Sequence, residues 1–261
     1  MEIIDLTEQH RELFCLCLED WSEEAREAGP RRSGWLDRME PLGLRAKLAV
    51  DDAGEVGGMI QYLPIEHSFV LGEDLWVIPC IWVHSYDEGR GDFSGNGMGT
   101  ALLEAAEQDA RARGAKGMVA WGLGVPVWMK ASWFRKHGYE VADRQNVRTL
   151  VWKPFDDDAV APRWIPEKEP PFDRHPGKVN ITAYSHGWCM AGNLVLERAR
   201  RVADEFGDAV VFDEVRLPDR RAMVEHGQID AVFLNGKDVS GGAPVSLEKL
   251  RRTVARQVRR L

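Results

Sequence analysis

Three glycines mark a short stretch of the chain, Gly95-Asn96-Gly97-Met98-Gly99-Thr100. It joins a largely apolar segment to one in which alanine and leucine recur at helical spacing, so we expect it to connect a buried strand to an amphipathic helix. Glycine lets the backbone approach a ligand closely, and the free N–H groups of a helix start bind anions. The stretch predicts a phosphate site, although glycine can also serve only to tighten such a turn.

Titratable side chains occur at the ends of the predicted strands around this stretch. His84 ends the apolar segment, and imidazole suits a general base at neutral pH, with a surface or capping role as the alternative. Glu66 and His67 follow the preceding strand, and we expect Glu66 to assist catalysis and His67 to bind substrate. Asp87 lies in the loop before the glycines and is a candidate contact for a cationic substrate, or is simply solvated.

A second reactive side chain lies far along the chain. Cys189 follows Trp188 and directly precedes a predicted helix, and helix N-termini favour the thiolate form of cysteine. Gly192 stands where a Cys-x-x-Cys pair would have its second cysteine, so this segment cannot carry out dithiol exchange alone. Cys189 is therefore a candidate for redox sensing or for capture of a thiol adduct, and a purely structural domain is the alternative.

The bulk composition limits the possible classes of protein. The chain has 261 residues, 44% of them hydrophobic, which is enough for a folded core. Its formal net charge of −8 argues against nucleic-acid binding. No apolar run approaches the ~20 residues of a membrane span, and the first residues lack a signal peptide, so we expect a cytoplasmic protein. The four cysteines are scattered without the spacing of a metal site.

Hydrophobic periodicity and turn residues predict the elements of the N-terminal segment. The expected strands are Glu2–Leu6, Arg45–Val50, Val56–Leu63, Leu75–His84, Gly117–Trp121, Tyr139–Asp143 and Val147–Trp152. The expected helices are Glu8–Trp21, Trp35–Leu42, Gly97–Arg113 and Val127–His137, with a helix break at Gly29-Pro30. The order is β-α-α-β-β-β-α-β-α-β-β, which is an α/β fold with a mixed sheet.

A proline-rich stretch separates this segment from the rest. Residues 154–176 contain six of the thirteen prolines, which excludes a helix or an inner strand there. We therefore predict a first domain at 1–153, a linker at 154–177 and a second domain at 178–261. The second domain is predicted from strands at Val179–Tyr184, Ala209–Val215 and Ile229–Leu234 and helices at Met190–Phe206, Asp219–Glu225 and after Ser246. Its order is β-α-β-α-β-β-α.

Over residues 1–152 the sequence resembles the GNAT (Gcn5-related) N-acetyltransferase family. Gly97 and Gly99 match the glycines of the family's pyrophosphate motif, whereas Ser94 replaces its usual glutamine or arginine. The stretch from Ala131 to Tyr139 is similar to the family's second signature, an aromatic-containing helix that ends in Gly-Phe or Gly-Tyr. The resemblance implies a GNAT mixed sheet and an acyl-CoA cosubstrate.

The resemblance also implies where coenzyme A would bind. Its pantetheine arm would lie where the strand Leu75–His84 separates from Gly117–Trp121, and Pro79 fits because proline forces a bulge or the loss of a partner strand. The expected arm contacts are Ile81, Trp82 and Val83. The N–H groups from Asn96 through Gly97, Met98, Gly99 and Thr100 would bind the pyrophosphate.

The implied reaction is transfer of an acetyl group from acetyl-CoA, without a metal, to a small amine that attacks the thioester directly. The family's usual tyrosine acid is replaced by Phe134, so a CoA-binding regulator without activity is one alternative. A thiol-redox or thiol-binding protein, with Cys189 as its centre and the first domain as a CoA sensor, is another. The expected partner is a small-molecule amine, with neither nucleic acid nor membrane, and a homodimer is left open.

The second domain resembles a thioredoxin-like fold in its element order and in the position of Trp188-Cys189. It departs from that fold at Gly192 and at Gln228-Ile229-Asp230, where a cis-proline would stand. The pairing of the two domains looks like the bacterial acetyltransferases with a YoaP-like C-terminal extension. This resemblance implies an architecture and no particular substrate.

Overall fold

The computed structural model describes residues 1–123, 129–170, 175–240 and 244–261. It divides the chain into two compact units, one of Met1–Trp21 with Leu36–Ile165 and one of Ser22–Trp35 with Pro166–Leu261. The boundary between Ile165 and Pro166 falls inside the predicted linker. Nothing in the sequence indicated that residues 22–35 belong to the C-terminal unit. The predicted helix start at Val127 lies outside the described residues.

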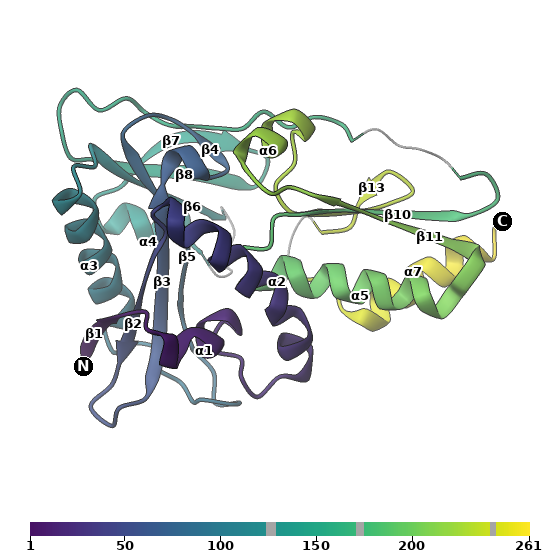
Figure 1. Ribbon diagram of the computed structural model, residues 1–261, viewed down its shortest axis with the longest axis horizontal. Helices are drawn as coiled ribbons and strands as arrows, with labels where there is room; N and C mark the ends of the chain where they lie inside the picture. The colour runs from purple at the N-terminus through teal and green to yellow at the C-terminus, as the bar shows by residue number, and fades with distance from the viewer. Residues whose placement is uncertain (124–128, 171–174, 241–243) are drawn as a thin grey trace. The chain divides into compact units, whose positions relative to one another are not determined.

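The first unit contains a seven-stranded sheet in the order β1-β2-β3-β5-β6-β8-β7 (Figure 1). All neighbouring strands are antiparallel except β5 and β6, which are parallel. The strands are β1 Glu2–Asp5, β2 Arg45–Val50, β3 Val56–Pro64, β5 Leu75–Val83, β6 Gly117–Leu123, β7 Glu140–Gln145 and β8 Arg148–Pro154. The mixed sheet and its strand order along the chain agree with the sequence prediction.

The helices of the N-terminal part of the chain are η1 Glu8–His10, α1 Arg11–Cys15, α2 Glu23–Met39, η2 Glu40–Leu42, η3 Ile65–His67, α3 Met98–Ala112 and α4 Ala131–Lys136. Most of α2 belongs to the second unit, which includes Ser22–Trp35. Helix α3 packs on strands β2, β3 and β5, with Leu102, Leu103, Ala106 and Ala110 buried. The helical periodicity predicted for α3 is confirmed. Packing of its buried face on the sheet holds the start of α3 near the end of β5.

Two helix predictions were wrong. The first helix does not reach Trp21 but ends at Cys15, since Cys17 and Leu18 adopt left-handed φ angles of 58° and 64° that a right-handed helix cannot continue. The predicted break at Gly29-Pro30 is absent, because α2 runs through Pro30. Pro30 lies on the exposed face, so the hydrogen bond lost at its missing N–H faces water, while buried residues such as Trp35 hold the helix in place.

Part of the proline-rich stretch packs into the first unit. Strand β9 (Arg163–Trp164) pairs with β4 (Val70–Leu71) in a separate two-stranded sheet. The Trp164 ring stacks on Phe69 with centroids 6.0 Å apart, and its backbone N–H donates to Asp143 at 2.9 Å. The linker predicted at 154–177 thus contains a short strand, and Trp164 anchors that strand to the first unit.

The second unit contains a four-stranded sheet in the order β11-β10-β12-β13. Strand β10 (Val179–Ser185) is parallel to β11 (Val210–Arg216) and antiparallel to β12 (Ala231–Leu234), which pairs with β13 (Lys237–Asp238). Its helices are α5 Met190–Phe206, η4 Gly207–Ala209, α6 Arg220–His226 and α7 Leu247–Val258, of which α5 and α7 lie side by side (Figure 1). The predicted order β-α-β-α-β-β-α is confirmed, and so is the Ser246 cap, whose Oγ accepts from the N–H of Lys249 at 3.3 Å.

Across the described residues of both units, no helix is long and apolar enough to cross a lipid bilayer.

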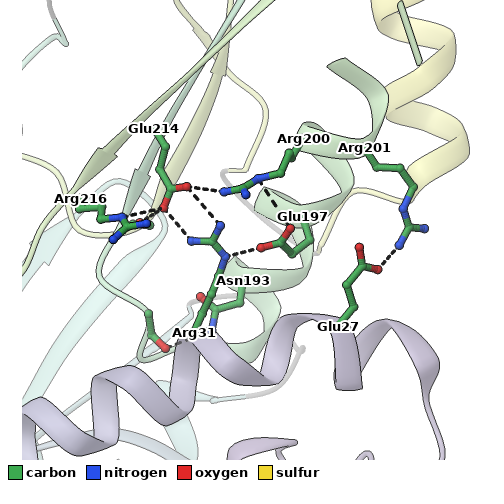
Figure 2. Close-up of polar contacts among 10 residues, drawn as sticks. Glu27, Arg31, Asn193, Glu197, Arg200, Arg201, Glu214 and Arg216 are labelled. Carbon is green, nitrogen blue, oxygen red and sulfur yellow. Dashed lines mark hydrogen bonds and ion pairs between the residues drawn. The ribbon is translucent and has the colours of Figure 1, made fainter. Parts of the chain in front are cut away.

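Glu214 on β11 is the centre of an ion-pair network within the second unit (Figure 2). Its carboxylate accepts hydrogen bonds from Arg31 at 2.7 and 3.2 Å, from Arg200 at 2.5 Å and from the Ser185 hydroxyl at 2.8 Å. Arg31 also pairs with Glu197. Burial alone would raise the pKa of Glu214, but the hydrogen bonds from Arg31 and Ser185 and the nearby cations lower it to about 2.

We expect Glu214→Gln to lower the free energy of unfolding at pH 7 by about 3 kcal/mol, because the arginines lose their shared anion. The pKa of Glu214 is depressed in the folded state, so its contribution is present above the unfolded pKa near 4.5 and lost as pH falls towards 2. Denaturant unfolding at pH 7 and pH 3 measures this difference. Glu205→Gln, which removes a more exposed pair with Arg251, serves as the control and should lower the free energy of unfolding much less. Equal losses for the two variants would contradict a special role of the network.

Candidate functional site

The parallel strands β5 and β6 separate halfway along their length. They pair from Leu75 with Gly117 to Ile78 with Ala120, and their pairing ends there. Beyond that point, the indole Nε1 of Trp121 donates to the carbonyl oxygen of Pro79 at 2.7 Å. The separation leaves the backbone of the second half of β5 without a β6 partner among the described residues.

Pro79 explains this separation. Strand β5 also changes register against β3, its neighbour on the other side. Gln61 pairs with Cys80, but Leu63 pairs with Val77. Proline has no N–H to donate, so an inner strand that contains it must bulge or lose a partner, and here β5 does both. The sequence prediction for Pro79 is confirmed. The rest of β5 keeps its pairing with β3 up to Val83, which holds its free edge in place.

The turn after β5 presents the start of α3 to this opening. Gly95 and Gly97 have left-handed φ angles of 76° and 77°, which disfavour any residue with a Cβ. The carboxylate of Asp92 accepts from the N–H of Ser94 at 2.7 Å and orders the approach to the turn. The first N–H groups of α3, from Met98 onwards, have no partner within the helix and carry the positive end of its dipole.

A pocket of about 470 Å³ lies between the turn, β5 and α4. Its polar end is formed by the backbone of Gly97–Thr100, and Lys130 supplies a cation. Its apolar wall is formed by the side chains Ile81, Val83, Phe93, Met98, Met129, Trp133 and Phe134. The described lining contains a cation but no carboxylate. An elongated ligand with an anionic end and an apolar arm therefore suits the pocket.

Helix α4 is fixed to the start of α3 through one histidine. The Thr100 hydroxyl and His137 Nε2 are 3.1 Å apart, and His137 Nδ1 lies 2.9 Å from the carbonyl oxygen of Trp133. The Trp133 and His137 rings contact each other with centroids 4.2 Å apart. These contacts hold the Trp133 ring against the position of Gly99, where a Cβ would meet it at 3.4 Å.

His84 lies one residue beyond β5 and points to the face of the sheet opposite Ile81 and Val83, because successive strand residues alternate. Its side chain is fully buried, and its Nδ1 lies 2.7 Å from the carbonyl oxygen of Gly91. Since a carbonyl only accepts, Nδ1 carries the proton and Nε2 carries the lone pair. Nε2 is buried and has no partner among the described residues.

Two aromatic residues complete this face. The His84 ring contacts Tyr86 with centroids 4.1 Å apart, and Tyr86 contacts Trp82 at 6.4 Å. The Tyr86 hydroxyl donates to Glu19, and burial together with this bond raises the pKa of Tyr86 above its ordinary value. Like Nε2 of His84, Nε1 of Trp82 is buried and lacks a partner within the described parts of the chain. This face therefore carries one buried donor and one buried acceptor without a hydrogen-bond partner among the described residues.

Several predicted site residues lie elsewhere. Glu66 and His67 are not near the turn, because β3 is antiparallel to β5 and its end therefore lies at the start of β5, beside Trp76. This placement corrects their expected roles. Asn96 is exposed between two glycines and does not line the pocket, and Asp87 is exposed in the loop after His84. The structure brings together Ile81, Val83 and Gly97–Thr100, with Trp82 and His84 on the opposite face.

The sequence did not indicate three lining residues, Phe93, Met129 and Lys130. One feature could have drawn attention to Lys130. It is a basic residue at the N-terminal cap of α4, where the helix dipole favours an acidic residue. Met129 has a left-handed φ of 53°, which no sequence pattern predicts for a methionine. Phe93 comes from the loop, and its N–H donates to the carbonyl of His84 at 2.9 Å.

Comparison with known families gives one match. The profile of the acetyltransferase (GNAT) family matches residues 7–139, about half of the chain, and covers β5, the glycine turn, α3 and α4. The chain belongs to the acetyltransferase (GNAT) family. No curated protein matches the chain.

Solved structures of other acetyltransferases are similar to the GNAT region at low identity. A ribosomal-protein-alanine N-acetyltransferase from Brucella melitensis is 18% identical, covering 59% of this chain and 100% of that one, with a TM-score of 0.45. The GNAT protein YhbS from Escherichia coli, in complex with CoA, is 14% identical, with coverages of 60% and 82% and a TM-score of 0.44. The PaiA N-acetyltransferase from Thermoplasma acidophilum, with coenzyme A, is 14% identical, with coverages of 59% and 98% and a TM-score of 0.42.

Phe134 occupies the position at which the GNAT family usually has a tyrosine acid. Phe134 lines the pocket there and has no proton to donate. Ser132 and Tyr139, the hydroxyl-bearing residues on either side of Phe134, do not line the pocket, since Ser132 is exposed and Tyr139 is buried against Phe134. Burial and the nearby Glu107 raise the pKa of Tyr139 well above its ordinary value, which makes it a poor acid.

Proposed function

We propose that the protein transfers an acetyl group from acetyl-CoA to the nitrogen of a small amine. The observation that carries this proposal is the separation of β5 from β6 directly before the glycine turn, which aligns a free strand edge with the N-terminus of α3. A strand edge can pair with the amides of a pantetheine arm, and a helix N-terminus can bind its pyrophosphate. Family membership supports the same assignment.

The pocket residues divide the task of holding coenzyme A. The N–H groups of Gly97–Thr100 would bind the pyrophosphate, with Lys130 as the balancing cation in place of the side chain that Ser94 lacks. The free edge at Ile81–Val83 would pair with the pantetheine arm, against the apolar wall of Trp133 and Phe134. The absence of a Cβ at Gly99 leaves room for the arm between Trp133 and Val83.

The acceptor would approach the thioester from the other face of β5. There, Nε2 of His84 has a free lone pair in a tautomer fixed by Gly91, which is the state that a general base requires. His84 would take a proton from the amine as its nitrogen attacks, and the indole N–H of Trp82 would donate to the acceptor or to the developing oxyanion. Asp87, in the exposed loop that follows, remains a candidate for attracting a cationic amine. The leaving thiolate would be protonated by water, because Phe134 cannot do it.

The C-terminal unit is inferred to be a thioredoxin-like domain of the YoaP-like type. Its element order and the parallel pairing of β10 with β11 support this inference.

Two measurements test the proposed function. Calorimetry with acetyl-CoA should show one binding site, and a thiol-release assay over a panel of primary amines should show turnover that depends on the amine. Absence of acetyl-CoA binding would overturn the proposal. Binding without thiol release from any amine would instead support a regulator that senses coenzyme A.

A further inference from the structure

A threonine at the start of α3 and a histidine at the end of α4 meet beside the pocket. Thr100 lines the pocket, and its hydroxyl oxygen lies 3.1 Å from Nε2 of His137. His137 directly follows α4, and its Nδ1 lies 2.9 Å from the carbonyl oxygen of Trp133. The imidazole ring therefore contacts one group that only accepts a hydrogen bond and one group that can both donate and accept.

The tautomer of His137 fixes the direction of the Thr100 O–H bond. Because the Trp133 carbonyl can only accept, Nδ1 carries a proton, and Nε2 of the neutral ring offers only a lone pair. The Thr100 hydroxyl must then donate to Nε2. In this state Thr100 has no O–H left to donate to an anion in the pocket, and presents only oxygen lone pairs.

Protonation of His137 reverses this hydrogen bond. Both nitrogens of an imidazolium ring are donors, so Nε2 donates to the Thr100 oxygen and the threonine proton is released. The released O–H can then donate to a phosphate oxygen bound at Gly97–Thr100. The positive charge of the ring, one hydrogen bond away from that anion, acts in the same direction. The His137 side chain is partly exposed, so it can take the proton from solvent.

The other charged groups around His137 come from the elements that surround it. Helix α4 packs on β6, which has no charged residue, and on β8. The charged residues are Glu104 and Glu107 on α3, Lys130, Arg135 and Lys136 at α4, Glu140 on β7, and Arg148 and Lys153 on β8. Lys153 pairs with Glu107 at 2.7 Å, and Arg148 lies over the Trp164 ring. The remaining five are exposed, where water and salt screen their charges.

We propose that His137 is a positioning residue that couples the binding of coenzyme A to the uptake of one proton. Phosphate oxygens only accept, so Thr100 can donate to the pyrophosphate only when His137 donates to Thr100. The bound coenzyme and the proton on His137 therefore stabilise each other, and the affinity falls as pH rises. This inference rests on the proposed function, because it requires the pyrophosphate to bind at the start of α3.

The test counts the protons that the full-length protein takes up when it binds 3′-dephospho-CoA. This probe keeps the pyrophosphate but lacks the 3′-phosphate, a monoester that itself titrates near pH ~6. Calorimetry at pH 7 in two buffers of different ionisation enthalpy gives the number of protons. For the wild type we expect uptake of roughly half a proton or more, and a Kd that rises at least ~5-fold between pH 6 and pH 8.

Three variants assign the proton to this pair of residues. Thr100→Val keeps the shape of the side chain but removes the hydroxyl, so proton uptake should vanish, whereas Thr100→Ser keeps the hydroxyl and should keep the uptake. His137→Gln places an amide N–H group near the position of Nε2, which leaves Thr100 able to donate at every pH. This variant should take up no proton and should bind the probe at pH 8 at least as tightly as the wild type.

The outcomes distinguish this inference from the proposed function. Absence of binding by the wild type at every pH would overturn both. Binding by the wild type without proton uptake would overturn the coupling alone, because it would mean that the Thr100 hydroxyl turns to the phosphate while His137 stays neutral. Uptake that persists in Thr100→Val would also overturn the coupling and leave the coenzyme site in place.

Discussion

Replacing Gly99 with leucine is expected to abolish acetyl-CoA binding while the protein remains folded. A Cβ at this position would lie 3.4 Å from the Trp133 ring and 3.8 Å from Val83, so the rest of the leucine side chain must enter the pocket between them. Gly99 has no left-handed φ, and it lies in the first turn of α3, where leucine is a good helix former. We expect the Kd for acetyl-CoA to rise at least ~100-fold, equivalent to about 2.7 kcal/mol.

Calorimetry on three variants separates this effect from damage to the helix. Gly99→Ala adds only a methyl group at ordinary contact distance, so it should weaken binding far less than Gly99→Leu. Glu104→Leu introduces the same side chain at an exposed position of α3 and should bind acetyl-CoA like the wild type. If Gly99→Leu bound acetyl-CoA normally, the pocket would not be the coenzyme site.

Much of the first unit could be predicted because its signals are local. The period of the apolar residues in α3, the glycines of the turn and the proline in β5 each act through the backbone of their own segment. Gly97 requires a left-handed φ, and Pro79 removes a donor wherever the strand lies. The position of the turn, directly after the strand that loses its partner, follows from these two residues without knowledge of the tertiary structure.

The errors came from residues whose position depends on distant parts of the chain. Glu66 follows the end of its strand as predicted. The direction of β3 relative to β5, however, decides at which end of the sheet Glu66 lies. Helix α2 continues through Pro30 because packing of its buried face outweighs the lost hydrogen bond, which propensity alone cannot show.

Replacing His84 is expected to reduce turnover strongly and to leave acetyl-CoA affinity unchanged. His84 lies on the face of β5 opposite the pocket, so it does not contact the coenzyme's arm or pyrophosphate. Loss of a general base typically slows a reaction ~10²–10⁴-fold. For His84→Ala we expect kcat for the best amine to fall at least ~100-fold, measured by thiol release, with the Kd from calorimetry unchanged.

A comparison of two variants decides how His84 acts. In His84→Asn, the side-chain amide can replace Nδ1 as donor to the Gly91 carbonyl, which keeps the loop closed but removes the lone pair of Nε2. If His84 is the base, His84→Asn should be as slow as His84→Ala. Recovery of activity in His84→Asn would show that the histidine only positions the loop through Gly91. His175→Asn, an exposed histidine of the second unit, provides the control for removal of an imidazole. The lone pair of Nε2, buried and unmatched by any described donor, is the reason to expect the first outcome.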